Sequence, residues 1–119
     1  MTVTDGNPEG EQIVTTIAVT PKVYTLVNVF AVDEDKQVEL YDHLVEVTES
    51  LIKDLPGFIS ANFHLSHDGR HVVNYAQWES EEHFRAMHAD SRLRDHFVFC
   101  RSISTPKSIP CDVSSVCGG

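Results

Sequence analysis

Two segments of the sequence place an asparagine among apolar residues. In the stretch VVNYAQWES (72–80), Asn74 and Trp78, the only tryptophan of the chain, fall on the same side of an extended backbone. Asn28 occupies a similar position in the stretch VYTLVNVFAV (23–32). A carboxamide can satisfy a buried backbone group, or its N–H groups can hold a negative charge in a pocket. These strand faces therefore belong either to a hydrogen-bonded core or to the lining of a pocket.

Histidine is the side chain that could move a proton at neutral pH. His64 lies on the polar side of the segment 58–66, where an imidazole with a pKa of about 6.5 could accept a proton. A strand that faces solvent would show the same polar pattern, so the structural interpretation stays open. His88 and His96 lie in helical segments that could cap the same pocket, although such a placement is more typical of structural or exposed histidines.

The seven histidines and three cysteines do not predict a metal site. There is no His-x-His pair, and His64 and His67, three residues apart, would point to opposite sides of a strand. Cys111 and Cys117 have no further ligand near them in the sequence. We therefore expect no metal.

The composition favours one soluble domain. The chain has 119 residues, of which 41% are hydrophobic and 23% charged. A formal net charge of -9 argues against a nucleic-acid or membrane partner, because both bind basic surfaces. No apolar run approaches the roughly 20 residues of a membrane helix. No secretory signal is visible. The odd number of cysteines suggests reduced thiols. We expect a cytoplasmic protein.

The hydrophobic periodicity predicts the elements that must position these residues. Residues 1–22 resemble a flexible arm with a possible short strand at 13–19, and residues 111–119 a loose tail. Between them, residues 23–110 form the predicted domain. Its first strand is 23–32, and its first helix, 33–55, stops at Pro56-Gly57. The inner face of this helix is predicted to consist of Val38, Tyr41, Leu44, Val45, Thr48, Leu51, Ile52 and Leu55.

The second half of the predicted domain consists of a β-hairpin, two helices and a last strand. A strand at 58–66 is followed by a turn at Asp68-Gly69 and a returning strand that ends near Trp78. Ser80 is placed to cap a helix, and a second short helix follows at 91–100. The two prolines of 103–113 predict an edge strand. The order β-α-β-β-α-β predicts an α+β, ferredoxin-like split βαβ fold with an antiparallel sheet. Its uncovered apolar sheet face predicts a homodimer, a dimeric α/β barrel.

Several segments resemble the antibiotic biosynthesis monooxygenase family, in the branch that forms quinones from aromatic polyketides. The resemblance runs from about Val23 to Ile109, and the segments that carry it are LVNVF, DLPGFISANFH, the DGR hairpin and VVNYAQWESEEHFR. It implies a monooxygenase that needs no flavin, haem or metal. Such an enzyme binds a planar anthrone- or naphthol-like intermediate, accepts a proton from it, and uses O2 to oxidise it to a quinone.

The resemblance also implies roles for individual residues. Asn28 and Trp78 match a pair considered catalytic in some relatives, and Asn74 and His64 match pocket residues of this branch. Where this branch often has a tyrosine, six residues after the tryptophan, this chain has Phe84, so a phenol proposed as a proton relay is missing. Either His64 or a water bound to an asparagine accepts the proton, or the substrate differs. The implied substrate-binding residues are Asn74, Phe84, Met87, Arg94 and Phe30.

Two other functions remain open on the same fold. One is a polyketide cyclase or a ligand-binding accessory protein, which the missing tyrosine would suit. The other is haem binding and degradation, for which His96 lies near the place of an axial ligand; the position of Trp78 does not match that of the tryptophan in such enzymes.

Overall fold

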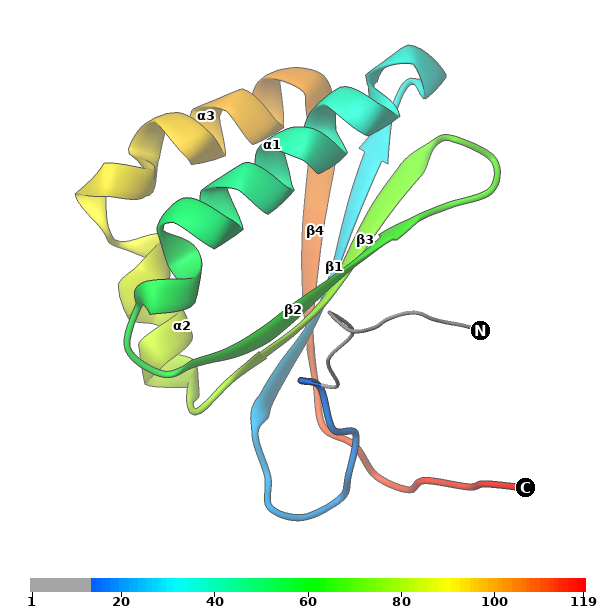
Figure 1. Cartoon of the computed structure of the whole chain (residues 1–119), viewed down its shortest axis with the longest axis vertical. Coiled ribbons are helices and arrows are strands. Elements are labelled where there is room, and N and C mark those ends of the chain that lie inside the picture. Colours follow the sequence, from blue (N-terminus) through cyan, green and yellow to red (C-terminus); the bar gives the residue numbers. More distant parts are fainter. Residues whose placement is uncertain (1–13) are drawn as a thin grey trace, which may run out of the picture.

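One antiparallel sheet forms the centre of the computed structural model, which describes residues 14–119 (Figure 1). Its four strands are arranged in the order β2-β3-β1-β4. An edge strand leaves one row of its backbone N–H positions unpaired, and proline has no N–H. Pro106 and Pro110 share one side of the backbone of the edge strand β4, so they fit this row. The strands are β1 (Tyr24–Val32), β2 (Phe58–Leu65), β3 (His71–Trp78) and β4 (Ser104–Cys111).

All the helices lie on one face of this sheet. Figure 1 shows α1 and α3 side by side across the strands, with α2 near one end. The predicted helix 33–55 is divided into α1 (Gln37–Ser50) and two short 3-10 turns, η1 (Glu34–Lys36) and η2 (Ile52–Asp54). The others are α2 (Glu81–His88), η3 (Ser91–Leu93) and α3 (Arg94–Ile103). The predicted element order and ferredoxin-like fold are thus confirmed.

The inner face of α1 differs from the prediction. Val38 is 59% exposed, so its assignment to the core was wrong. Leu44 is buried as predicted, and Leu40, which the prediction left out, is buried as well. Gln37 is also buried, and its Nε2 donates hydrogen bonds to the carbonyl oxygens of Ser66 and His71. This amide ties the first turn of α1 to the hairpin and rotates Val38 away from the sheet.

The register of β1 and β3 brings the two asparagines together. Asn28 is paired with Asn74, and Tyr24 with Trp78, on the face that the helices cover. A β-bulge between Phe58 and Ser60 shifts the start of β2. As a result Phe58 stands opposite Trp78 there, a pairing that simple alternation does not predict.

Two clusters of buried residues fill the space between the helices and the sheet. The cluster at the α2 end comprises Leu26, Ala76, Trp78, Met87 and Leu93. The cluster beneath α1 and α3 comprises Val32, Leu40, Leu44, Val72 and Cys100.

The segment before β1 contacts the opposite face of the sheet. Thr15 Oγ1 donates a hydrogen bond to Asn62 Oδ1, and Gln77 Nε2 donates one to the carbonyl oxygen of Thr16. Residues 14–19 form no strand, which leaves the arm of the two alternatives for this segment, and residues 1–13 lie outside the described residues. After Cys111 the chain has no regular secondary structure.

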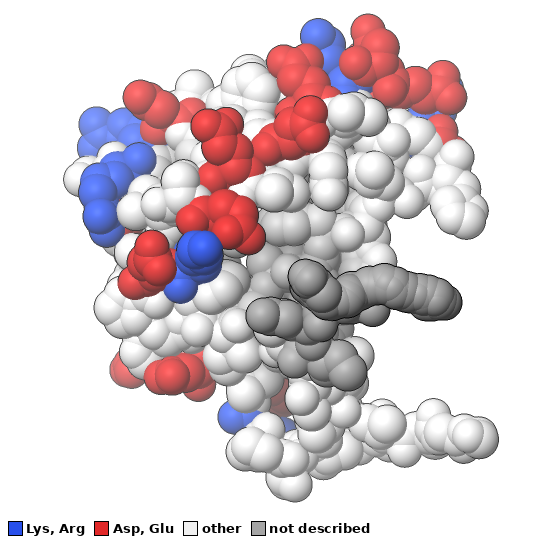
Figure 2. All heavy atoms as spheres, in the orientation of Figure 1, with Lys and Arg blue, Asp and Glu red and all other residues white. Residues whose placement is uncertain are grey.

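The surface over α1 is acidic. Figure 2 shows Asp and Glu side chains gathered above this helix and the turn before it, whereas the part of this face near the C-terminal tail carries few charges. Within residues 14–119, no helix combines the length and the hydropathy needed to cross a membrane.

Candidate active site

A cavity of about 270 Å³ opens between the sheet and the last two helices. Its floor comes from β1 and β4, and its walls come from α2 and α3. Most of the side chains around it are aromatic or apolar, as in pockets for flat organic ligands. The lining residues are Asn28, Phe30, Phe84, Met87, His88, Phe97, Cys100, Arg101, Pro106 and Ser108.

The amide of Asn28 is held in the cavity by the neighbouring strand. Asn28 pairs with Ser108 in the β1–β4 register, and Ser108 Oγ donates a hydrogen bond of 2.6 Å to Asn28 Oδ1. The acceptor end of the amide is therefore occupied. Among residues 14–119, no group accepts a hydrogen bond from Asn28 Nδ2, so the amide can donate to a bound molecule.

Asn74 has a structural contact. Its Oδ1 accepts a hydrogen bond of 3.0 Å from the backbone N–H of Asn62, in the adjoining strand β2. The side chain of Asn74 faces the helices like that of Asn28, but it does not line the cavity. For Asn74, the structure therefore supports the hydrogen-bonded core rather than the pocket.

Trp78 lies behind the cavity wall. Only 2% of Trp78 is exposed, and the residue is absent from the cavity lining. Its ring meets the rings of Phe58 and Phe84 edge to face, with centroids 5.4 and 6.4 Å away. Trp78 thus supports Phe84, which does line the cavity, and is not itself in a position to stack on a ligand there.

An aromatic row continues from Phe84 along the wall. The centroid of His88 lies 4.8 Å from that of Phe84, and its ring stacks on Phe97 at 4.7 Å with an angle of 5° between the planes. These three rings form an aromatic wall of the cavity, whose floor includes Asn28 and Phe30. Such a wall suits a planar aromatic molecule.

His88 is the ionisable base of the cavity. Burial lowers the pKa of His88, and the positive charge of Arg101 lowers it further. The imidazole is therefore neutral at neutral pH and able to accept a proton. Arg101 also lines the cavity, where a permanent cation can stabilise an anionic ligand.

The structure does not bring His64 and Arg94 to this cavity. His64 pairs with Val73 on the opposite face of the sheet, is exposed, and has its Nδ1 3.0 Å from the carbonyl oxygen of Asn62. Arg94 is exposed at the start of α3 and is not part of the lining. Within the described residues these two side chains therefore lie apart from Asn28. Asn28, Phe30, Phe84 and Met87 do share the cavity.

Sequence reasoning missed two polar or charged residues of the lining, Arg101 and Ser108, and it placed a third, His88, on a helix that could cap the pocket. His88 had a visible signal, since it follows Phe84 and Met87 at helical spacing. Arg101 and Ser108 had none, because their places depend on how α3 and β4 pack against β1.

One group of three or more possible metal ligands occurs within residues 14–119: His43, His96 and Cys100. It adjoins the cavity through Cys100. His96 itself does not line the cavity, and its Nδ1 lies 2.9 Å from His43 Nε2. An axial haem ligand would face the cavity. His96 instead lies beside another imidazole.

Known proteins share both the sequence and the fold of the chain. It is 64% identical over 99 residues to tetracenomycin-F1 monooxygenase of Streptomyces glaucescens, an alignment that covers 83% of this chain and 88% of the relative. A monooxygenase from the gene ActVA-Orf6 of Streptomyces coelicolor, solved with the ligand nanaomycin D, has a TM-score of 0.74 and 32% identity. That match covers 82% of this chain and 93% of the other.

A more distant solved structure shows the same fold. SnoaB of Streptomyces nogalater, described as a cofactor-independent oxygenase, has a TM-score of 0.70 at 22% identity and covers 79% of this chain and 95% of its own. A family model described as antibiotic biosynthesis monooxygenase matches residues 23–97, well over half of the sequence. The chain therefore belongs to the antibiotic biosynthesis monooxygenase family.

Proposed function

We propose that the protein is a cofactor-free monooxygenase that oxidises an anthrone- or naphthol-like polyketide intermediate to a quinone with O2. The observation that carries the proposal is the pairing of two groups in one aromatic cavity. Asn28 offers an oriented N–H donor, held by Ser108, and His88 offers a neutral imidazole. The names of the similar proteins support the same chemistry, since they describe monooxygenases, one with nanaomycin D bound and one independent of cofactors.

The substrate itself supplies the electrons in this reaction. Loss of a C–H proton from the methylene carbon of an anthrone gives an electron-rich enolate, which passes one electron to O2. The resulting radicals combine to a peroxide, and the proton returns to its outer oxygen. Loss of the second hydrogen with cleavage of the O–O bond gives the quinone carbonyl and water. One oxygen atom enters the product and the other leaves as water, so a methylene group and O2 become a carbonyl group and water.

The residues of the cavity can assist each charged stage. His88 accepts the first proton and returns it to the peroxide, a role that does not need the phenol missing at Phe84. Asn28 Nδ2 and the guanidinium of Arg101 stabilise the enolate and the reduced oxygen. Trp78 acts through packing, by holding Phe84 against the substrate.

The face of the sheet away from the helices supports a homodimer. No helix among residues 14–119 covers it. Its half-buried or exposed apolar side chains form a patch of the kind that usually binds another subunit, and two such sheets packing face to face would give the α/β barrel. The patch consists of Val27, Val29, Val73, Tyr75 and Ile109.

The cysteines support a reducing compartment for this protein. Cys100, Cys111 and Cys117 are all free thiols, and Cys111 and Cys117 are exposed. Exposed free thiols persist where glutathione keeps them reduced, as in a cytoplasm.

Oxygen uptake tests the proposed function. Protein treated with a chelator and free of haem is given a simple anthrone, with spontaneous oxidation subtracted, while a second sample carries Asn28→Asp. We expect one O2 consumed for each quinone formed by the wild type, and little above background from the variant. Uptake that requires an added metal or flavin would overturn the proposal, as would equal rates in the two proteins.

A further inference from the structure

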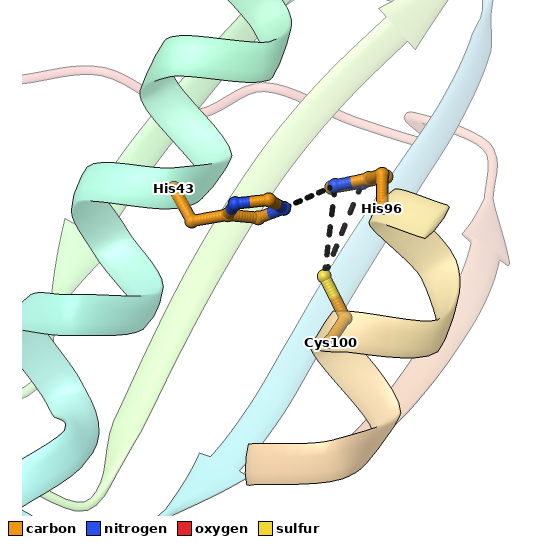
Figure 3. Close-up of side chains that lie close together, drawn as sticks. All are labelled: His43, His96 and Cys100. Atoms are coloured by element: carbon orange, nitrogen blue, oxygen red, sulfur yellow. Dashed lines mark hydrogen bonds between the residues drawn. The ribbon is translucent and has the colours of Figure 1, made fainter. Parts of the chain in front are cut away.

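Three side chains that bind metals well gather between α1 and α3, outside the catalytic groups described above. Figure 3 shows His43 of α1 pointing toward His96, one turn along α3 from Cys100. His43 Nε2 lies 2.9 Å from His96 Nδ1, which is 3.8 Å from Cys100 Sγ. The three donor atoms all lie within 4.8 Å of one another.

Two of the three donor separations are close to those of a tetrahedral metal site, and the third, between His43 and Cys100, is within 4.8 Å. With Zn–N bonds of about 2.0–2.1 Å and a Zn–S bond of about 2.3 Å, tetrahedral geometry places two nitrogens about 3.3 Å apart and a nitrogen about 3.6 Å from a sulfur. His43 and His96 would thus separate by about 0.4 Å, and His96 and Cys100 would approach by about 0.2 Å. Rotations of half-buried side chains provide shifts of this size.

The protonation states favour the two nitrogen ligands. Burial, together with the nearby His43 and His88, lowers the pKa of His96 to about 4. Burial also lowers the pKa of His43. Both imidazoles are therefore neutral at neutral pH. One of the two facing nitrogens donates the hydrogen bond between the rings, so its proton must move to the other nitrogen of that ring when an ion binds.

The sulfur ligand must lose a proton. Burial raises the pKa of Cys100 to about 11, so an ion displaces the thiol proton when it binds. The charged or titratable groups that act on the three ligands are Glu46 on α1, His88 on α2 and Arg101 on α3. Metal affinity should rise with pH, because each bound ion releases one proton.

We propose that His43, His96 and Cys100 form a binding site for Zn2+ or a similar divalent transition-metal ion. Nitrogen and sulfur donors select such ions over Mg2+ and Ca2+. Three protein ligands leave the fourth position open, and because Cys100 also lines the cavity, that position lies next to the bound substrate. The ion is not needed for oxygenation; it links α1 to α3 and adds a positive charge beside the cavity.

Cobalt spectroscopy of the untagged protein tests the site. Co2+ bound by two imidazoles and a thiolate gives visible bands of tetrahedral type and a thiolate charge-transfer band in the near ultraviolet. We expect both to saturate at one ion per chain and to disappear when Zn2+ is added. Saturating Zn2+ should also raise Tm by at least about 5 °C, because the ion binds only the folded chain.

Matched variants identify the ligands. His43→Gln and Cys100→Ser should each lose the cobalt bands and the Tm increase. His43→Gln is less prone to disturb folding, because His43 is only half-buried. His64→Gln and the double variant Cys111→Ser/Cys117→Ser should bind like the wild type, since these residues lie elsewhere and are exposed.

Two results would overturn the proposal. One is the absence of tetrahedral bands in the wild type at about 1 mM Co2+, a concentration that fills about nine tenths of a site whose Kd is about 0.1 mM. The other is the loss of those bands in the control variants while His43→Gln retains them. Either outcome would leave His43 and His96 as a hydrogen-bonded pair only.

Discussion

Asn28 has its side-chain oxygen occupied and its nitrogen available, which makes it the clearest catalytic candidate of the cavity. Replacing it by Ala removes the donor, and we expect kcat to fall by about 10²–10³-fold, the usual effect of losing one oxyanion donor. Ser108→Ala should cost less, about 5–10-fold, since it loosens the amide without removing it. Steady-state kinetics with one anthrone checks both values.

Thr105→Ala is the control for this pair. Thr105 lies in the same strand as Ser108 but on the other side of its backbone. It should retain the wild-type kcat. A Ser108→Ala enzyme as fast as this control would show that Asn28 needs no positioning from β4.

The pH dependence of the reaction should report on His88. Only its neutral form accepts a proton, so kcat/KM should be constant at neutral pH and fall as the pH drops through a pKa below about 6.5. Arg101→Gln removes a positive charge that lowers this pKa, so the fall in kcat/KM should begin at a higher pH. His88→Gln should abolish this limb and reduce the rate. A profile that is the same in Arg101→Gln and the wild type would contradict the assignment.

The candidate site was predictable where its residues lie in a regular pattern. Asn28, Phe30, Phe84 and Met87 follow the strand and helix periods, and all four line the cavity. Strand alternation placed His64 on the face opposite Ala61 and Phe63, but it does not say which of the two faces the helices cover. The distinction between Asn28 and Asn74 depends on their partners, Ser108 and the backbone of Asn62, which only the folded sheet supplies.

At the scale of elements, Gly57 controls the connection between η2 and β2. Its φ of +81° disfavours any residue with a side chain, and an added Cβ would collide with the ring of His83 on α2. Gly57→Ala should therefore lower the free energy of unfolding by more than the roughly 1–2 kcal/mol that the backbone conformation alone costs. Chemical denaturation measures the difference.

Gly69 of the hairpin provides the comparison. Its φ of +75° is similar, but its added Cβ would meet only the flexible side chain of Glu34, at 3.4 Å. Gly69→Ala should cost about 1–2 kcal/mol, and less than Gly57→Ala. Equal losses in the two variants would mean that the contact with His83 does not matter.

The order and type of the helices and strands could be predicted from the local sequence. The rotation of α1 and the bulge in β2 could not. Asp68-Gly69 and the Ser80 cap, which accepts a hydrogen bond from the His83 N–H, lie where the sequence placed them. The rotation of α1 that exposes Val38 arises from the bonds that Gln37 makes to the distant hairpin. The bulge in β2 arises from its pairing with β3, which no local pattern contains.

At the scale of the whole molecule, the sheet face that no helix of residues 14–119 covers should mediate dimerisation. Sedimentation velocity at about 20 µM should show a dimer, because an interface of standard size holds well below that concentration. Val73→Lys, in the middle of the patch, should give a monomer.

Val38→Lys controls for the added charge, since Val38 is 59% exposed on the outer side of α1. It should remain dimeric. A monomeric wild type, or dimers of unchanged stability in Val73→Lys, would exclude this face as the interface.

The most direct test of the account is to mix enzyme and anthrone without O2 and record the absorption spectrum. If the cavity alone activates the substrate, the bound enolate should form in the anaerobic, chelator-treated wild type and decay to quinone when O2 is added. Asn28→Ala and His88→Gln should show little enolate. Quinone formation at the wild-type rate in both variants, or no enolate before O2 in any protein, would contradict the proposal that these side chains drive the reaction.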